Sequence, residues 1–172
     1  MSEDMFGLDK SEGLFGDLDI ASASIVTGPP ADAYKAIITR FERAATRNDE
    51  NKFGLNITYT RLEGEWEGYD EREWLWIPTG PEPTEEEEKK DRNKARTKIK
   101  KRLVSLGVPE KQMNNLDPEV MLNLEVIITT AMKSQPDDRN PTYLKGVVLA
   151  SSTNFRPSPQ ALKGTAKANP FA

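Results

Sequence analysis

The sequence predicts a mainly β fold with one inserted α-helix, an α+β arrangement of five strands. Two observations predict it. Short runs of alternating or β-branched apolar residues recur between residues 33 and 150, separated by turns that contain Gly or Pro. Between the third and fourth runs lies one long stretch with the period of an amphipathic helix. The 172 residues suit one domain with extensions, because single cores usually occupy roughly 100–200 residues.

The five strands are predicted from their apolar pattern and from the turns around them. The second run, Phe53 to Thr60, alternates apolar and polar residues, which is typical of a strand with one buried face. The third run follows the glycine-containing turn at residues 63–68 and stops at Pro78. The fourth is rich in Val, Ile and Thr. The predicted strands span residues 33–41, 53–60, 73–77, 122–132 and 142–150.

The helix is predicted from its start signal, its apolar face and its end. Thr84 and Glu87 have the spacing of a capping box, and Gly107 and Pro109 are typical of a helix end. A short helical turn is expected at Asp117-Pro118. Residues at spacings of four and three should face the sheet: Ala95, Ile99, Leu103 and Leu106.

This order of elements is that of an OB-fold, a small, partly open barrel that binds oligonucleotides on one face. We therefore expect a five-stranded OB-type barrel over residues 25–150. Residues 1–24 form an acidic leader, and residues 151–172 are rich in Ser, Pro, Lys, Ala and Asn. Both tails are predicted to be disordered, because neither carries enough apolar residues for a core.

Composition excludes several classes of site. The chain contains no Cys and no His, which removes disulfides, thiolate nucleophiles, most hydrolase triads and most transition-metal sites. We expect no metal, no cofactor and no enzymatic activity. No apolar run approaches the roughly 20 residues of a membrane span, and the acidic start lacks the basic and apolar regions of a secretion signal. A cytoplasmic protein is expected, with its oligomeric state left open.

The acidic leader contains a candidate docking segment. Residues 1–20 carry six acids against Lys10, a net charge of −5, while the whole chain carries −4. Within them, bulky apolar residues alternate with acids in a short imperfect repeat. One interpretation is a solubilising leader; the other is a linear motif that binds a partner or covers a basic groove. The second assigns partner binding to Phe6, Leu8, Phe15 and Leu18.

Aromatic and basic residues interleave along the predicted strands. Single-stranded nucleic acid is bound by aromatic faces that stack on bases and by cations that contact phosphates. The alternative is that the aromatics only build the core. Trp74 and Trp76 share one strand face, while Leu75 and Ile77 share the other, which we assign to the barrel interior. The candidate nucleic-acid-binding residues are Arg40, Arg47, Tyr59, Arg61, Trp66, Arg72, Trp74, Trp76, Lys98, Arg139, Tyr143 and Lys145.

The second half of the predicted helix is strongly basic. Its bases could follow a phosphate backbone, which supplies most non-specific affinity for nucleic acid. Alternatively, the order of acids first and bases last simply suits the helix dipole.

Four parts of the chain share a pattern with known proteins: residues 28–40, the run Leu55 to Tyr69 with its Glu-Gly-Glu-Trp-Glu-Gly turn, the helix end at residues 103–108, and the closing pair of strands. Through these parts, the stretch from Gly28 to Ala150 resembles a family of bacteriophage-encoded single-stranded-DNA-binding proteins. The resemblance implies an OB-fold that coats single strands during phage DNA replication or recombination. Single-strand binders commonly end in an acidic tail that recruits partners; here the acidic, Phe-containing segment is N-terminal. It would therefore recruit replication or recombination proteins, or mask the binding face.

The expected function is non-catalytic binding of single-stranded DNA in the host-cell cytoplasm. Three alternatives stay open at this point. The same barrel could bind a protein, for example as an inhibitor whose acidic leader imitates DNA, or it could be a small structural protein of a virion. A Mg²⁺-dependent nuclease would need acids and a lysine, and the nearest approach is Asp137 and Asp138 with Lys145.

Overall fold

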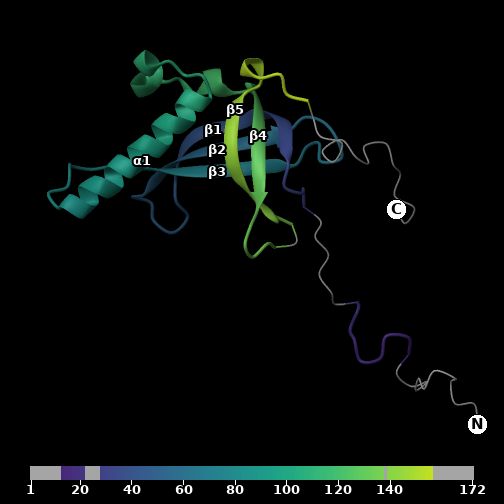
Figure 1. The fold of residues 1–172 in the computed structure, drawn as a ribbon. Coiled ribbons are helices and arrows are strands. Elements are labelled where there is room, and N and C mark those ends of the chain that lie inside the picture. Colours follow the sequence, from purple (N-terminus) through teal and green to yellow (C-terminus); the bar gives the residue numbers. More distant parts are fainter. Residues whose placement is uncertain (1–12, 22–27, 138, 157–172) are drawn as a thin grey trace, which may run out of the picture.

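The computed structural model describes residues 13–21, 28–137 and 139–156. Five antiparallel strands form one strongly curled sheet, a half-barrel in the order β3-β2-β1-β4-β5, and β4 and β5 cross the direction of the other three (Figure 1). One long helix, α1, lies against this half-barrel. The elements are β1 (Ala33–Ala45), β2 (Phe53–Arg61), β3 (Asp70–Ile77), α1 (Glu86–Ser105), the 3-10 helices η1 (Glu110–Asn115) and η2 (Pro118–Met121), β4 (Glu125–Met132), β5 (Thr142–Leu149) and η3 (Ala150–Ser152).

The predicted mainly β fold with one inserted helix is confirmed, although strand bounds differ: β1 runs to Ala45 instead of Phe41, β3 begins at Asp70 instead of Glu73, and the start of the fourth strand also changes. The predicted strand began at Leu122, but β4 begins at Glu125. Asn123 has a φ of 65°, a left-handed conformation that interrupts an extended strand. The predicted helical turn is present as η2, and the Asp117 side chain accepts a hydrogen bond from the Glu119 backbone N–H at 3.0 Å.

The core lies inside the curl of the sheet. Along β1 and β2, every second side chain points inward at the centre of each strand, so Ile38, Ile57 and Tyr59 are fully buried. Val126 and Ile128 of β4 close the core from the other side. Partly buried residues pack around this cluster, including Leu75, Ile77, Ile99 and Leu144.

The start of α1 differs from its prediction, whereas its end agrees. Glu85 is the N-cap and makes no side-chain cap hydrogen bond, so the predicted Thr84–Glu87 capping box is wrong. Thr84 lies one residue too early to reach the first free N–H groups. At the other end, Gly107 has a φ of 79°, and the Val108 N–H donates to the Leu103 carbonyl at 3.0 Å. This is a Schellman cap, which accounts for the glycine.

Only part of α1 packs on the sheet. Ala95, Leu103 and Leu106 are buried, as predicted, and the N-terminal turns of the helix project past the sheet (Figure 1). Arg102 anchors the packed half to β3: its Nε and one terminal nitrogen donate to the Glu73 carboxylate, both at 2.8 Å. Burial alone would lower the pKa of Arg102, but its bonds with Glu73 raise it overall.

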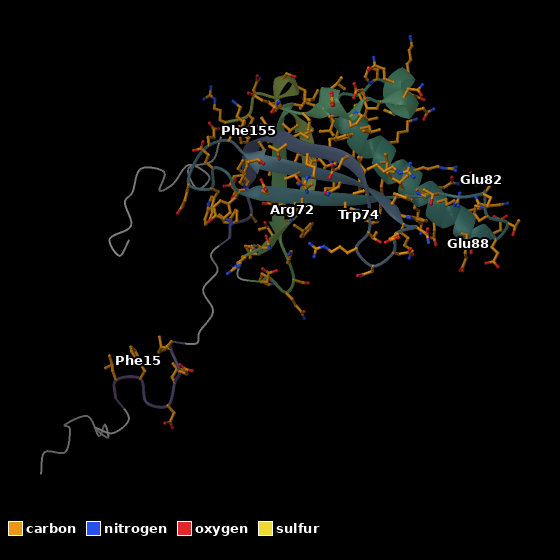
Figure 2. The ribbon with its side chains drawn as sticks, turned by 180° about the vertical axis from the view of Figure 1, so that it is seen from behind. Phe15, Arg72, Trp74, Glu82, Glu88 and Phe155 are labelled. Carbon is orange, nitrogen blue, oxygen red and sulfur yellow. The ribbon has the colours of Figure 1, made fainter. Side chains whose placement is uncertain are left out.

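The segment after β5 folds back on the sheet. The tail was expected to be disordered from Ser151, but Ser151 and Ser152 belong to η3. Phe155 is half-buried and lines a pocket together with Lys35, Ile127 and Leu149 (Figure 2). Residues 150–155 therefore cover part of the outer surface of β1 and β4.

The burial of Tyr34 leads us to expect that the free energy of unfolding falls at alkaline pH. Burial raises the pKa of its phenol to about 12, although the Arg61 charge opposes this, and the hydroxyl donates to the Pro30 carbonyl at 2.5 Å. The unfolded phenol ionises near pH 10, so the stabilisation is complete below pH 10 and is lost as pH rises to about 12. Urea unfolding should show about 2–3 kcal/mol lost over this interval. Tyr34→Phe should lose less over the same interval; an equal loss would contradict the assignment.

No helix among the described residues is both long enough and apolar enough to cross a membrane.

Candidate nucleic-acid interface

Two tryptophans lie on the outer face of β3. Trp74 and Trp76 are 45% and 38% exposed, whereas Leu75 and Ile77 between and after them pack against the core. The predicted division of this strand into an inner and an outer face is therefore confirmed. Because alternate residues of a strand are roughly 6.6 Å apart, the two indoles lie side by side on one surface.

The residues around these indoles on the sheet surface are small or polar. Opposite Trp76 lies Gly54 of β2, and opposite Trp74 lies Asn56. Each row continues onto β1, so the outer surface spans three strands. From one end of the surface to the other, the rows across β1, β2 and β3 are Ala44–Gly54–Trp76, Glu42–Asn56–Trp74 and Arg40–Thr58–Arg72.

Gly54 provides the space in which the indole of Trp74 lies. A Cβ atom at position 54 would fall 2.0–2.3 Å from three atoms of that indole. The ring therefore lies directly over the β2 backbone. No other residue type would allow this placement without a shift of the ring or the strand.

Gly54→Ala should displace the Trp74 indole and alter its emission. The added methyl group overlaps the ring, so we expect a changed tryptophan fluorescence spectrum and a loss of about 1–3 kcal/mol of unfolding free energy. Gly146→Ala is the matched control, because nothing lies within 4 Å of a Cβ at that position of β5. Identical spectra for the wild type and Gly54→Ala would show that the ring does not depend on this contact.

A groove separates β3 from α1 beside the tryptophans. It has a volume of about 470 Å³ and brings Lys94 and Lys98 of α1 to the same side as Trp74 and Trp76. Asp91 is the one acid among the residues that line it. Lys98, one of the predicted site residues, is thus placed next to the aromatic surface by the packing of α1.

A second groove lies between the two free edges of the sheet. Its volume is about 620 Å³, and its walls come from the first residues of β3, the first residues of β5 and the loop between β4 and β5. It brings together the predicted residues Arg72, Arg139 and Tyr143 and adds Tyr69 and Lys133. Figure 2 shows that Arg72 and Trp74 lie along the same strand. The aromatic surface and this groove are therefore adjacent.

Tyr59 and Arg61 are corrections to the predicted site. Tyr59 is fully buried and donates its hydroxyl to the Glu73 carboxylate at 2.9 Å, so its ring offers no face for stacking. Burial, followed by the Glu73 charge, raises the pKa of Tyr59. Both residues share the inward face of β2 with Leu55 and Ile57.

Arg61 is a structural cation within the barrel. Its side chain has no exposed surface, lies 4.3 Å over the Tyr34 ring and pairs with Glu71 at 3.3 Å. Burial lowers the pKa of Arg61 and raises that of Glu71, while each charge opposes the shift of the other. The guanidinium is thus enclosed and cannot reach a phosphate.

The other predicted residues are spread over the surface. Trp66, a residue of the predicted site, is half-buried against the core, and its ring contacts Tyr69 edge-on with the ring centroids 5.2 Å apart. Arg40 is exposed, and its Nε atom lies 3.7 Å from the Glu42 Oε1 atom. Arg47 is exposed in the β1–β2 loop, and Lys145 is exposed on β5 and lines neither groove.

The leader is described only in part. Phe15 and Leu18 are 60% and 67% exposed, in a turn that lies apart from the sheet (Figure 2). Phe6 and Leu8 lie outside the described residues.

Of the two acids considered for a nuclease site, Asp137 instead accepts hydrogen bonds within its own loop. Asp137 accepts hydrogen bonds from the backbone N–H groups of Asn140 and Arg139, at 2.7 and 3.1 Å, and these bonds lower its pKa. Asp138 lies outside the described residues. In the part of the chain that the structure covers, no three acidic side chains converge into a metal-binding group.

Sequence reasoning missed Gly54, Lys94 and Lys133. The spacing of Lys94 and Lys98, four residues apart, does place them on one helix face. No local pattern indicates which strand that face meets, since the contact depends on how α1 crosses β3. Gly54 carried no signal, because a glycine inside a strand has several possible roles.

The chain matches no protein-family model and no curated protein sequence. The functional argument therefore depends on the geometry of this surface.

Proposed function

We propose that this is a non-catalytic single-stranded-DNA-binding protein whose half-barrel is of the OB type. The observation that carries the proposal is the pair of outward-facing indoles on β3, Trp74 and Trp76, beside the cations of α1 and β3. Bases stack on indoles regardless of sequence, and each stacked base contributes roughly 1–3 kcal/mol.

The topology supports an OB-type barrel. An OB-fold is a five-stranded, partly open Greek-key barrel that binds oligonucleotides over its second and third strands. Here β1 pairs with both β2 and β4, a helix joins β3 to β4, and the starts of β3 and β5 face each other across the second groove. The indoles lie over β2 and β3, as that binding mode requires.

The electrostatics of the surface also support binding of a polyanion. Arg72, Lys94, Lys98 and Arg139 are exposed around the aromatic surface. The buried cations Arg61 and Arg102 are neutralised by Glu71 and Glu73 and take no part. Together with the resemblance to phage single-strand binders, this supports a role in phage DNA replication or recombination in the host cytoplasm.

Titration of the intrinsic fluorescence with a thymine oligonucleotide tests the proposal. Binding should quench Trp74 and Trp76, leave the half-buried Trp66 as residual emission, and weaken as salt rises. A duplex of equal length should quench much less, because its bases are already stacked. Absence of quenching and of binding by a second method would contradict the proposal and would favour a protein-interaction module.

A further inference from the structure

The Lys and Arg side chains of α1 divide into two sets: those that make an ion pair or a hydrogen bond within the described chain, and those that do not. Five of them contact acids or backbone carbonyls. These contacts hold the loop before the helix, the η1 turn and β3 against α1. The pairs are Lys89 with Glu86, Arg92 with the Thr79 and Gly80 carbonyls, Arg96 with Glu82, Lys100 with Glu110, and Arg102 with Glu73.

The other four bases form what we call the lysine stripe: Lys90, Lys94, Lys98 and Lys101. All are exposed, and none makes an ion pair or a side-chain hydrogen bond with the described part of the chain. Their spacings of four, four and three place them on one side of the helix.

The lysine stripe continues the aromatic surface. Its two central members, Lys94 and Lys98, line the groove with Trp74 and Trp76. From Lys98 to Lys90 the stripe runs toward the N-terminus of α1, whose first turns project past the sheet (Figure 1). Lysines four residues apart are about 6 Å apart along the helix axis, close to the separation of successive phosphates on a stretched strand.

We propose that the lysine stripe is a phosphate track that carries a bound single strand off β3 and along α1. This inference rests on the proposed function and extends its interface from the sheet to three turns of the helix. Like charges at this spacing repel one another, and a bound anion relieves that repulsion. A polyanion satisfies all four lysines at once, and the neighbouring indoles favour a nucleic acid over an acidic peptide.

The test compares two triple variants of the full chain that lose the same charge. One is Lys90→Gln/Lys94→Gln/Lys98→Gln, in the stripe. The other is Lys89→Gln/Arg96→Gln/Lys100→Gln, on the partnered side of the same helix. The affinity of each variant for a thymine oligonucleotide is measured at several salt concentrations from the quenching of tryptophan fluorescence. Each phosphate contact on a single strand contributes about −0.7 to the slope of log affinity against log salt. The slope of the stripe variant, which lacks three such contacts, should therefore be less negative than that of the wild type by roughly 2.

The expected result is roughly tenfold weaker binding at low salt for the stripe variant, and a slope close to wild type for the control. Equal losses in both variants would overturn the track, because the net charge alone would then explain them. A wild-type slope in the stripe variant would also overturn it, while the proposed function stands if the wild type still binds. Circular dichroism of both variants establishes that α1 is intact. No binding by the wild-type protein would remove the proposed function and this inference together.

Discussion

Replacing either exposed tryptophan by alanine is expected to weaken single-strand binding by about 1–3 kcal/mol, or about 5- to 150-fold. Trp74 and Trp76 present the only large aromatic faces among the described residues of β3. Their truncation removes stacking surface without opening the core, because both rings lie outside it. Quenching titration is blind to a lost tryptophan, so anisotropy of a labelled thymine oligonucleotide is the measurement.

The controls for this prediction separate stacking from folding. Val148→Ala removes an exposed apolar side chain on β5 and should leave affinity unchanged. Trp74→Phe and Trp76→Phe keep an aromatic face and should retain part of the affinity. Because the Trp74 ring packs over the β2 backbone, its truncation is expected to lower stability, and urea unfolding must show that every variant is folded under the conditions of the binding assay. Unchanged affinity in the double alanine variant would contradict stacking on β3.

Arg102→Met is expected to lower the free energy of unfolding by about 3 kcal/mol. The side chains of Arg102 and Glu73 are only 16% and 13% exposed, and they share two hydrogen bonds of 2.8 Å. Without Arg102, the Glu73 carboxylate keeps only the Tyr59 hydroxyl as a partner among the described residues and is left as a largely buried charge. The measurement is urea unfolding followed by circular dichroism.

A double-mutant cycle separates this pair from a general effect on α1. Glu73→Gln/Arg102→Met removes both charges while an amide oxygen still accepts from Tyr59, so its loss should be smaller than the sum of the single losses. Arg96→Met breaks an exposed pair between the same helix and Glu82 in the loop before it, and should cost much less than Arg102→Met. Equal losses for Arg102→Met and Arg96→Met would show that the buried pair has no special role.

Strand parity could have placed Tyr59 and Arg61 before the structure was known. Leu55, Ile57, Tyr59 and Arg61 alternate along β2, so all four share the inward face. Both residues were nevertheless predicted to bind nucleic acid, because one is aromatic and the other basic. Arg61 is tolerated inside because Glu71 and Tyr34, from two other strands, surround its guanidinium.

The sequence by itself determined the order of elements, the end of α1 at Gly107 and the outward direction of Trp74 and Trp76. These features follow from local rules of period, cap geometry and side-chain alternation. Only the tertiary structure decided which basic side chains are free of an acidic partner and therefore available to a ligand. Arg102 and Lys98 both lie in the basic half of one helix, yet Arg102 is held by Glu73 while Lys98 lines the groove beside the indoles. The physical reason is that a charge is neutralised by whatever packs against it, and those neighbours come from strands far away in the sequence.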